Sequence, residues 1–328
     1  MRPTPSIRLE TSSYCNLRCP SCPTTSRAID PVIGKGFLKL ADFQQLLRDN
    51  PDLKRIELSN YGELFLNPDI IPIMACAHER GVRLAADNGV NFNKVSDAQL
   101  AALVQYGFSF LRCSIDGASD ATYPIYRRNG DFSTVLRNLG KLNALKQAAG
   151  SALPVLHWQF VIMGHNEHEI PQARALAQQL GMTFELKLTW DPDFSPVTDR
   201  AAVTRELGGE PATRAEYLEK HGVPYLASIC DQLWDQPQFN WDGKLLGCCR
   251  NFWGDFGGNL FQDGLAASLR SEKLQHAKLM LQGRAAPRAD IPCTTCEIYL
   301  QRQAAGRWMK RRPIRKFLAR LWHRLRGK

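Results

Sequence analysis

The sequence predicts an α/β fold: a partial (β/α)6 barrel followed by a small C-terminal module. Over the first 190 residues, short apolar runs alternate with segments of helical periodicity. Such alternation is typical of a parallel sheet covered by helices. It supplies about six β/α units, whereas a closed parallel barrel takes eight, so we expect the barrel to stay open. The length of 328 residues leaves room for a second, smaller module.

The elements expected in residues 1–190 follow in regular order. The apolar runs predict strands at Ile7–Glu10, Arg55–Ser59, Val82–Ala86, Phe110–Ile115, Val155–Met163 and Thr183–Thr189. The helical patterns predict helices at Leu40–Asp49, Ile70–Arg80, Asp97–Tyr106, Phe132–Ala148 and Glu167–Leu180. Ser96 is the expected N-cap of the third helix. Ligands of parallel sheets bind at the carboxyl ends of the strands, so motifs directly after a strand are the candidate site.

Three segments follow the barrel. Residues 191–229 are rich in Pro, Asp, Thr and Glu, which predicts a connector with some helix, and residues 230–300 form the small module. Residues 301–328 are a basic tail with one apolar helical face, made of Ile314, Phe317, Leu318, Leu321, Trp322 and Leu325. We expect this helix to dock on an anionic membrane surface, at about 1 kcal/mol per basic residue. The alternatives are RNA, an acidic partner protein, and packing on the body of the protein.

The net charge of +10 is confined to the tail. Residues 301–328 carry eleven Lys or Arg and no acid, which leaves about −1 for the first 300 residues. The body therefore need not bind polyanions, and no specific nucleic acid is expected as a partner. Residues 1–14 lack the apolar segment of a signal peptide, and no apolar run approaches the roughly 20 residues of a membrane span. We expect a cytoplasmic protein that is peripheral at the membrane through its tail.

Eight of the ten cysteines fall into two groups. In a reducing cytosol this many thiols indicate metal binding and not a disulfide framework. The other two, Cys76 and Cys113, stand alone in apolar segments, where a cysteine usually behaves as a small buried hydrophobe.

The first group is the C-x3-C-x2-C motif of Cys15, Cys19 and Cys22, directly after the first strand. Three thiolates in one loop can hold three irons of a cubane [4Fe–4S] cluster, which normally takes four Cys ligands. The fourth iron is then open, as a catalytic site requires. A zinc site is the alternative, but it would need a fourth ligand.

This motif after the first strand of a β/α run resembles the radical S-adenosylmethionine (radical SAM) superfamily. The resemblance implies that the open iron binds the methionine part of S-adenosylmethionine. It further implies reductive cleavage to a 5′-deoxyadenosyl radical that abstracts hydrogen from a substrate. One departure is Ser21, where the family often has an aromatic residue.

Further motifs follow in the family's order, each directly after a strand. Gly62 and Glu63 resemble the G-G-E motif that binds the methionine ammonium, although Tyr61 replaces the first glycine. Asn88 resembles part of the T-N-G turn, for which an ordinary Asn-Gly turn is the alternative. Ser114 begins a segment similar to S-[IL]-D-G, whose serine commonly faces the ribose or the carboxylate of the cofactor.

Two more similarities concern charged residues. Arg127 is similar to an arginine that pairs with the cofactor's carboxylate, with Arg128 as an equal alternative. Asn166 and Glu169 resemble the family's N-x-x-E segment, and capping of the following helix is the alternative.

The second group consists of Cys230, Cys248, Cys293 and Cys296. Four thiolates complete a closed cubane, although a zinc ribbon fits the same count. The pattern resembles the SPASM and twitch extensions of radical SAM enzymes. It is most similar to the one-cluster twitch form of the amino-cyclitol dehydrogenase of aminoglycoside biosynthesis.

Cys249 is the spare thiol of this group. A thiol can donate a hydrogen atom to a carbon radical, as in the epimerases that carry such an extension. The alternatives are a structural cysteine, or Cys249 as the ligand with Cys248 spare.

The expected function is hydrogen abstraction from a sugar, cyclitol or glycan, giving epimerisation or dehydrogenation. The expected cofactors are two [4Fe–4S] clusters and S-adenosylmethionine, with an external electron donor of the flavodoxin or ferredoxin type. Peptide or protein modification is the first alternative. A zinc-binding nucleic-acid adaptor is an alternative of another class, and metal content separates it from the rest.

Overall fold

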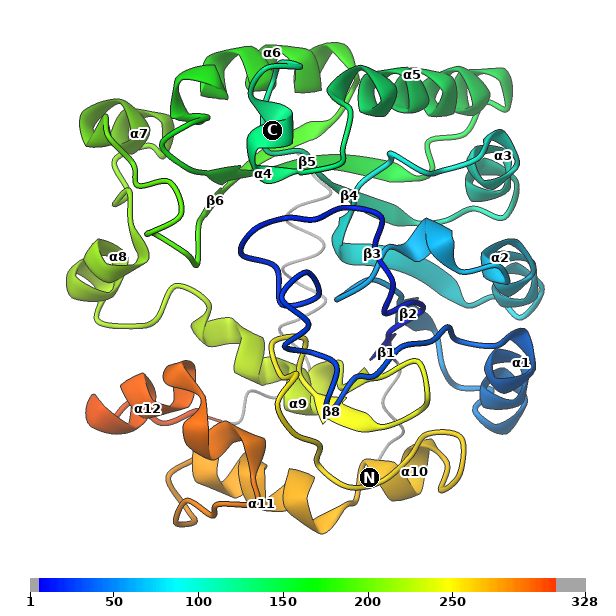
Figure 1. Ribbon diagram of the computed structural model, residues 1–328. Helices are drawn as coiled ribbons and strands as arrows, with labels where there is room; N and C mark the ends of the chain where they lie inside the picture. The colour runs from blue at the N-terminus through cyan, green and yellow to red at the C-terminus, as the bar shows by residue number, and fades with distance from the viewer. Residues whose placement is uncertain (1–5, 311–328) are drawn as a thin grey trace.

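The computed structural model describes residues 6–310 (Figure 1). The expected amphipathic helix of the tail, from Ile314 to Leu325, lies outside these residues, as does the membrane contact expected of it. None of the helices within residues 6–310 is both long and apolar enough to cross a membrane.

One curved sheet organises the described residues, with strand order β6-β5-β4-β3-β2-β1-β7-β8. Its strands are β1 (Ser6–Leu9), β2 (Arg55–Glu57), β3 (Arg83–Val90), β4 (Phe110–Ser114), β5 (Val155–Ile162), β6 (Thr183–Leu188), β7 (Gln238–Phe239) and β8 (Leu245–Gly247). All neighbours pair in parallel except β7 and β8. The end strands β6 and β8 do not pair with each other. The predicted partial barrel is therefore confirmed.

Most helices of the first half of the chain cover the convex side of this sheet (Figure 1). The first half of the chain contributes α1 (Leu40–Asp49), α2 (Ile70–Glu79), α3 (Asp97–Gln105), α4 (Tyr123–Tyr126), α5 (Phe132–Ala148) and α6 (Ile170–Gln179). The second half contributes α7 (Arg200–Glu206), α8 (Arg214–His221), α9 (Gln232–Asp235), α10 (Leu265–Ser268), α11 (Glu272–Leu281) and α12 (Glu297–Ala304). The 3-10 helices are η1 (Leu64–Leu66), η2 (Glu167–Glu169), η3 (Ala227–Asp231) and η4 (Pro292–Thr295).

The strands alternate between an apolar outer face and a polar inner face. Leu111 and Trp158 are fully buried in the core between sheet and helices. Arg112 and Glu185 face the other way and form an ion pair. Because side chains alternate along a strand, this pattern assigns the polar face to the barrel interior. Cys113 is fully buried on the apolar side, as predicted for a small hydrophobe.

Local signals set most element boundaries. The predicted N-cap Ser96 is confirmed, because its side chain accepts from the backbone N–H of Gln99 in a capping box. The helix expected at Glu167–Leu180 is instead split into η2 and α6. Pro171, in the first turn of α6, has no backbone N–H to continue a preceding helix, so the α-helix begins at Ile170.

Strand β3 runs further than expected. It includes Asp87, Asn88 and Gly89, so the Asn-Gly turn expected there is wrong. The pairing of β3 with β4 shifts register between Ala86 and Val90. Gly89 has φ +125°, and a Cβ there would lie 2.1 Å from the hydroxyl oxygen of Ser114. The glycine at this irregularity therefore allows strand β4 to approach closely, and it does not reverse the chain.

The C-terminal region continues the barrel's own sheet. Strand β7 pairs in parallel with β1, and the buried side chain of Arg8 donates to Gln238 at 3.1 Å. The β7–β8 hairpin then brings Cys248, which directly follows β8, to the β1 side of the barrel. The second cysteine group is thus tied to the first strand through backbone hydrogen bonds.

Candidate functional site

The first cysteine group lies in the loop after β1, on the concave side of the sheet (Figure 1). The N–H of Cys22 donates to the carbonyl of Cys19 at 3.1 Å, which folds the motif back on itself. Burial, together with the charges of Glu63 and of the other two thiols, raises the pKa of the Cys15 thiol to about 12. The three cysteines are therefore close enough to act on one another electrostatically.

Nitrogen donors surround these sulfur atoms. The Sγ of Cys15 accepts from the N–H of Leu17 at 3.5 Å and from the Asn91 amide at 3.9 Å, and the Sγ of Cys19 accepts from Arg127 at 3.7 Å. Hydrogen bonds to sulfur stabilise thiolates that ligate iron. The donor set therefore fits a cluster held by the loop. Among residues 6–310, no three His, Cys, Asp or Glu side chains are grouped to hold a single metal ion.

The loop after β2 packs directly against the cysteine loop. The N–H of Glu63 donates to the carbonyl of Tyr14 at 2.7 Å, and a Cβ at Gly62 would lie 1.9 Å from the carbonyl oxygen of Ser12. Burial raises the pKa of Glu63 to about 7, although the N–H groups of Asn91 and Phe65 donate to its carboxyl and oppose this. A buried carboxylate beside the cysteine loop suits the binding of a cationic amine.

Glu10 is a site residue that the sequence analysis missed. Its buried carboxyl accepts from the N–H groups of Tyr61 at 2.8 Å and of Gly62 at 3.3 Å. Burial raises its pKa to about 8. It therefore positions the backbone of the Gly62–Glu63 motif. Its position in the sequence could have identified it as a site residue. An acid at the end of an apolar strand lies at the carboxyl end of a barrel strand, where ligands bind.

Asn88 and Ser114 lie on the neighbouring strands β3 and β4. The Asn88 amide donates to the side chain of Asn60 at 2.6 Å, and its backbone N–H donates to Ser59 at 3.0 Å. Ser114 is buried against Gly89. Both are thus at the same end of the sheet as the loop after β2.

Arg127 follows α4 and faces the cysteine loop, whereas Arg128 is exposed. The guanidinium of Arg127 forms an ion pair with the fully buried Asp116 at 2.6 Å and also donates to Cys19. The second oxygen of Asp116 accepts from the N–H of Val161 at 2.7 Å. The pair therefore links the loop after β4, strand β5 and the cysteine loop.

Replacing Asp116 with asparagine should lower the free energy of unfolding of the apoprotein by about 3 kcal/mol, because it leaves a buried guanidinium without its counter-charge. Urea unfolding measures this. Lys141→Gln is the control: it breaks an exposed ion pair with Asp97 and should cost less than about 1 kcal/mol. Equal losses in the two variants would contradict this role for the buried pair.

Asn166 and Glu169 do not cap the following helices with their side chains. The Asn166 amide donates to the carbonyls of Asp116 and Val161, at 3.1 and 3.0 Å. Glu169 accepts from the N–H of Ala118 at 2.6 Å. The capping alternative is therefore wrong, and these side chains hold the loop after β4.

The second cysteine group gathers from four separate elements. Cys230 lies in η3, Cys248 follows β8, Cys293 lies in η4 and Cys296 precedes α12. Burial raises the pKa of Cys293 well above its usual value, and the thiols of Cys248, Cys230 and Cys296 raise it further. The thiols of Cys248, Cys230 and Cys296 therefore lie within electrostatic range of Cys293.

Cys249 lies between this group and the barrel. Its thiol accepts from the amide of Gln232 in α9 at 3.4 Å, and its carbonyl accepts from the hydroxyl of Tyr61 at 2.9 Å. Its charge would act on Cys248, and also on Tyr61 and Lys187 of the barrel. Tyr61, where the family has a glycine, is the side chain that connects the barrel to the Cys249 backbone.

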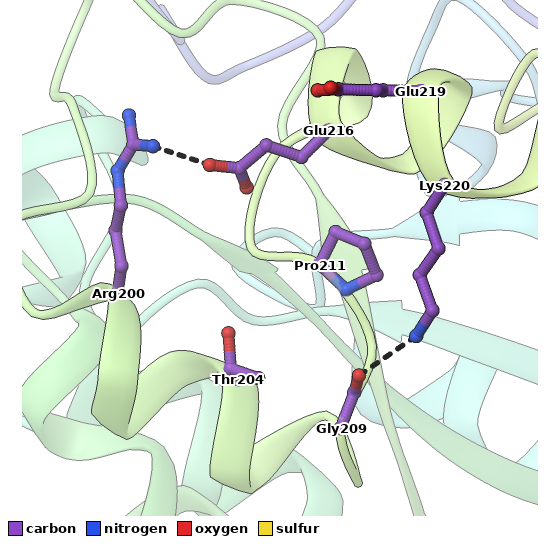
Figure 2. Close-up of a pocket in the computed structure, with 7 residues that line it drawn as sticks. All are labelled: Arg200, Thr204, Gly209, Pro211, Glu216, Glu219 and Lys220. Atoms are coloured by element: carbon purple, nitrogen blue, oxygen red, sulfur yellow. Dashed lines mark hydrogen bonds and ion pairs between the residues drawn. The ribbon is translucent and has the colours of Figure 1, made fainter.

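A surface hollow of about 470 Å³ lies between α7 and α8, away from the cysteines (Figure 2). Three of its charged groups already have partners: Arg200 pairs with Glu216, and Lys220 donates to the carbonyl of Gly209 at 3.0 Å. It contains none of the groups described above, so we do not assign the site to it.

Comparison with known proteins tests whether the chain belongs to the family that its cysteine motif resembles. Residues 9–177 match the radical SAM superfamily. Streptococcus suis SuiB bound to S-adenosylmethionine has a similar fold, with a TM-score of 0.62 and 12% identity over 90% of this chain and 71% of that chain. Native anSMEcpe with bound AdoMet gives a TM-score of 0.60 and 13% identity over 89% and 86%. No curated protein matches the sequence. The match over half of the chain, on an open parallel barrel with C-x3-C-x2-C after β1, shows that the protein belongs to the radical SAM superfamily, whose enzymes use a [4Fe–4S] cluster and S-adenosylmethionine.

Proposed function

We propose that this enzyme abstracts hydrogen from a sugar- or cyclitol-type substrate and epimerises it, with Cys249 returning a hydrogen atom. The observation that carries this proposal is the different surroundings of two adjacent cysteines: Cys248 lies within electrostatic range of the other thiols of its group, while the backbone of Cys249 is bound by the Tyr61 hydroxyl of the barrel. A thiol that is not needed as a ligand and that lies at the edge of the barrel would be available to a substrate radical.

The residues around the first loop have distinct proposed roles. Cys15, Cys19 and Cys22 hold the cluster, and together with S-adenosylmethionine it supplies the radical that abstracts hydrogen. Gly62 and Glu63 receive the amino group of the cofactor, and Arg127 its carboxylate. Asn88 and Ser114 contact its nucleoside part. The burial of Glu63 and the contact of Arg127 with Cys19 support the first two assignments.

A second cluster is proposed for Cys230, Cys248, Cys293 and Cys296. We propose residues 1–190 as the radical SAM core, 191–229 as the connector, 230–300 as a twitch-like module and 301–328 as the basic tail. The electron donor is a protein of the flavodoxin or ferredoxin type. Since the chain belongs to an enzyme superfamily, we do not propose the zinc-binding adaptor.

The return of hydrogen by Cys249 needs one electron and one proton to restore the thiol. The carbon radical of the substrate takes a hydrogen atom from the thiol, so an S–H bond breaks and a C–H bond forms. The thiyl radical left on Cys249 is restored by one electron and one proton, with the electron coming from the external donor. Delivery to the face opposite the abstraction inverts the carbon centre.

Replacing Cys249 with alanine should therefore leave hydrogen abstraction and 5′-deoxyadenosine release in place but remove the epimer. Anaerobic turnover of candidate glycosides and cyclitols in heavy water measures both. In the wild type, the epimer should carry one deuterium, because the thiol exchanges with solvent. Normal epimer formation by the alanine variant would remove the proposal.

Two other outcomes remain as alternatives within the family. Dehydrogenation would give an oxidised product without deuterium. Peptide modification is suggested by the similar fold of SuiB, which has been solved bound to the precursor peptide SuiA. Incorporation of deuterium into a small glycoside separates epimerisation from both.

A further inference from the structure

One side of the barrel interior is lined by strands β4, β5 and β6. Their register places Ser114, Gln159 and Glu185 in one row across the sheet, and Val161 beside Lys187 in the row two residues further on. Residues two apart on a strand face the same side. Lys187 therefore lies on the polar inner face, one row nearer than Glu185 to the carboxyl end of the sheet.

The carboxylate in this region already has partners. Glu185 pairs with Arg112 and lies 3.7 Å from the ring of His157. The ammonium of Lys187, by contrast, forms no hydrogen bond or ion pair with any of residues 6–310. Burial and the charges of Arg112 and Arg214 lower the pKa of Lys187 to about 8, although the charges of Glu185 and Cys249 oppose this. Lys187 is therefore a half-buried cation without a counter-charge in direct contact.

A second cation contacts the backbone of Leu188, the residue that follows Lys187. Arg214, at the start of α8, donates to the carbonyl of Leu188 at 3.2 and 2.9 Å and lies over the ring of Tyr225 at 5.2 Å. It forms no ion pair within the described part of the chain. Lys187 and Arg214 thus carry two positive charges at the carboxyl end of β6 that no carboxylate of residues 6–310 neutralises by contact.

Gln159 provides an independent indication of a ligand. Its side chain lies between the Ser114 and Glu185 positions and is only 6% exposed. Its Oε1 has no hydrogen-bond partner among the described residues. An unsatisfied buried acceptor costs about 1–3 kcal/mol, which a hydroxyl donor from a bound molecule would recover.

We propose that the substrate carries an anionic group, a carboxylate or a phosphate, that binds between Lys187 and Arg214, with a neighbouring hydroxyl donating to Gln159. This inference rests on the proposed function, in which the substrate reacts beside Cys249, and narrows the substrate class to acidic or phosphorylated polyols. Lys187 lies within electrostatic range of Cys249, so the proposed anion and the proposed hydrogen donor belong to the same part of the barrel.

The test is the labelling rate of Lys187 in the reconstituted enzyme under anaerobic conditions. An amine-reactive reagent is added with inorganic phosphate, with acetate, or with chloride at equal ionic strength, and each lysine is quantified by mass spectrometry. A bound anion shields Lys187 and raises its pKa, so labelling should slow about threefold or more at saturating anion. The exposed Lys220 of the surface hollow in Figure 2 is the internal control and should not respond.

The outcomes show whether the anionic group of the substrate is a phosphate or a carboxylate. Protection by phosphate alone supports a phosphorylated substrate, protection by acetate alone a carboxylate, and protection by both a general anion site. If neither phosphate nor acetate protects Lys187 more than chloride does, the proposal is overturned, and the wild-type protein suffices for this result.

Arg214→Gln should also remove the protection, whereas Arg200→Gln, in the surface hollow, should retain it. Full protection in Arg214→Gln would exclude Arg214 from the site. Deoxyadenosine release is measured separately, so a failure of the proposed radical function remains distinguishable.

Discussion

Replacing Cys19 with alanine should abolish 5′-deoxyadenosine release. If the proposed second cluster is present, the iron content should fall from about eight to about four per chain, because one of the two proposed cubanes would lose a ligand it cannot replace. Cys19 is buried in the centre of the motif, and the guanidinium of Arg127 donates to its sulfur at 3.7 Å. The first loop has three cysteines, so no spare thiol there can take its place.

The measurement combines iron analysis after anaerobic reconstitution with chromatography of the reaction with dithionite. Cys76→Ala is the matched control, because Cys76 lies on α2 and packs half-buried against the core, away from both groups. It should retain iron and activity. A Cys19→Ala protein that keeps eight irons and still releases deoxyadenosine would refute the assignment of the loop.

Replacing Gly62 with alanine should produce the second-largest effect. The new Cβ would lie 1.9 Å from the carbonyl oxygen of Ser12 and 2.8 Å from that of Tyr14. These are backbone atoms, and the hydrogen bonds from Glu63 to Tyr14 and from Gly62 to Glu10 hold the two loops together. We expect the loops to separate, with a loss of about 1–3 kcal/mol in the free energy of unfolding.

The same displacement moves Glu63 relative to the cysteine loop. The affinity for S-adenosylmethionine, measured by equilibrium dialysis, should therefore fall by more than about tenfold, which corresponds to 1.4 kcal/mol. Gly140→Ala is the control, because Gly140 lies within α5 and a Cβ there meets no atom within 4 Å. That variant should be more stable by up to about 1 kcal/mol and bind the cofactor normally. Unchanged affinity in Gly62→Ala would exclude this loop from the cofactor site.

Periodicity and capping were sufficient to predict the barrel elements. Helices α1 and α5 begin and end at the predicted residues, and each strand from β1 to β6 was located to within a few residues. These features depend on side chains a few positions apart, which a single sequence displays directly. The error at β3 arose where a contact distant in sequence decided the local structure, because Ser114 packs against Gly89. The split of the helix expected at Glu167–Leu180 instead has a local cause, Pro171, which the apolar periodicity does not register.

The sequence by itself determined the α/β class, the open barrel and the motif that identifies the superfamily, because periodicity and cysteine spacing are local properties. Only the tertiary structure brought Glu10 to the backbone of Gly62 and continued the barrel sheet through β7. It also turned the neighbours Cys248 and Cys249 towards different partners and left Lys187 without a contacting acid. These features depend on strand register and on which loops meet, and both are set by packing between segments far apart in the chain.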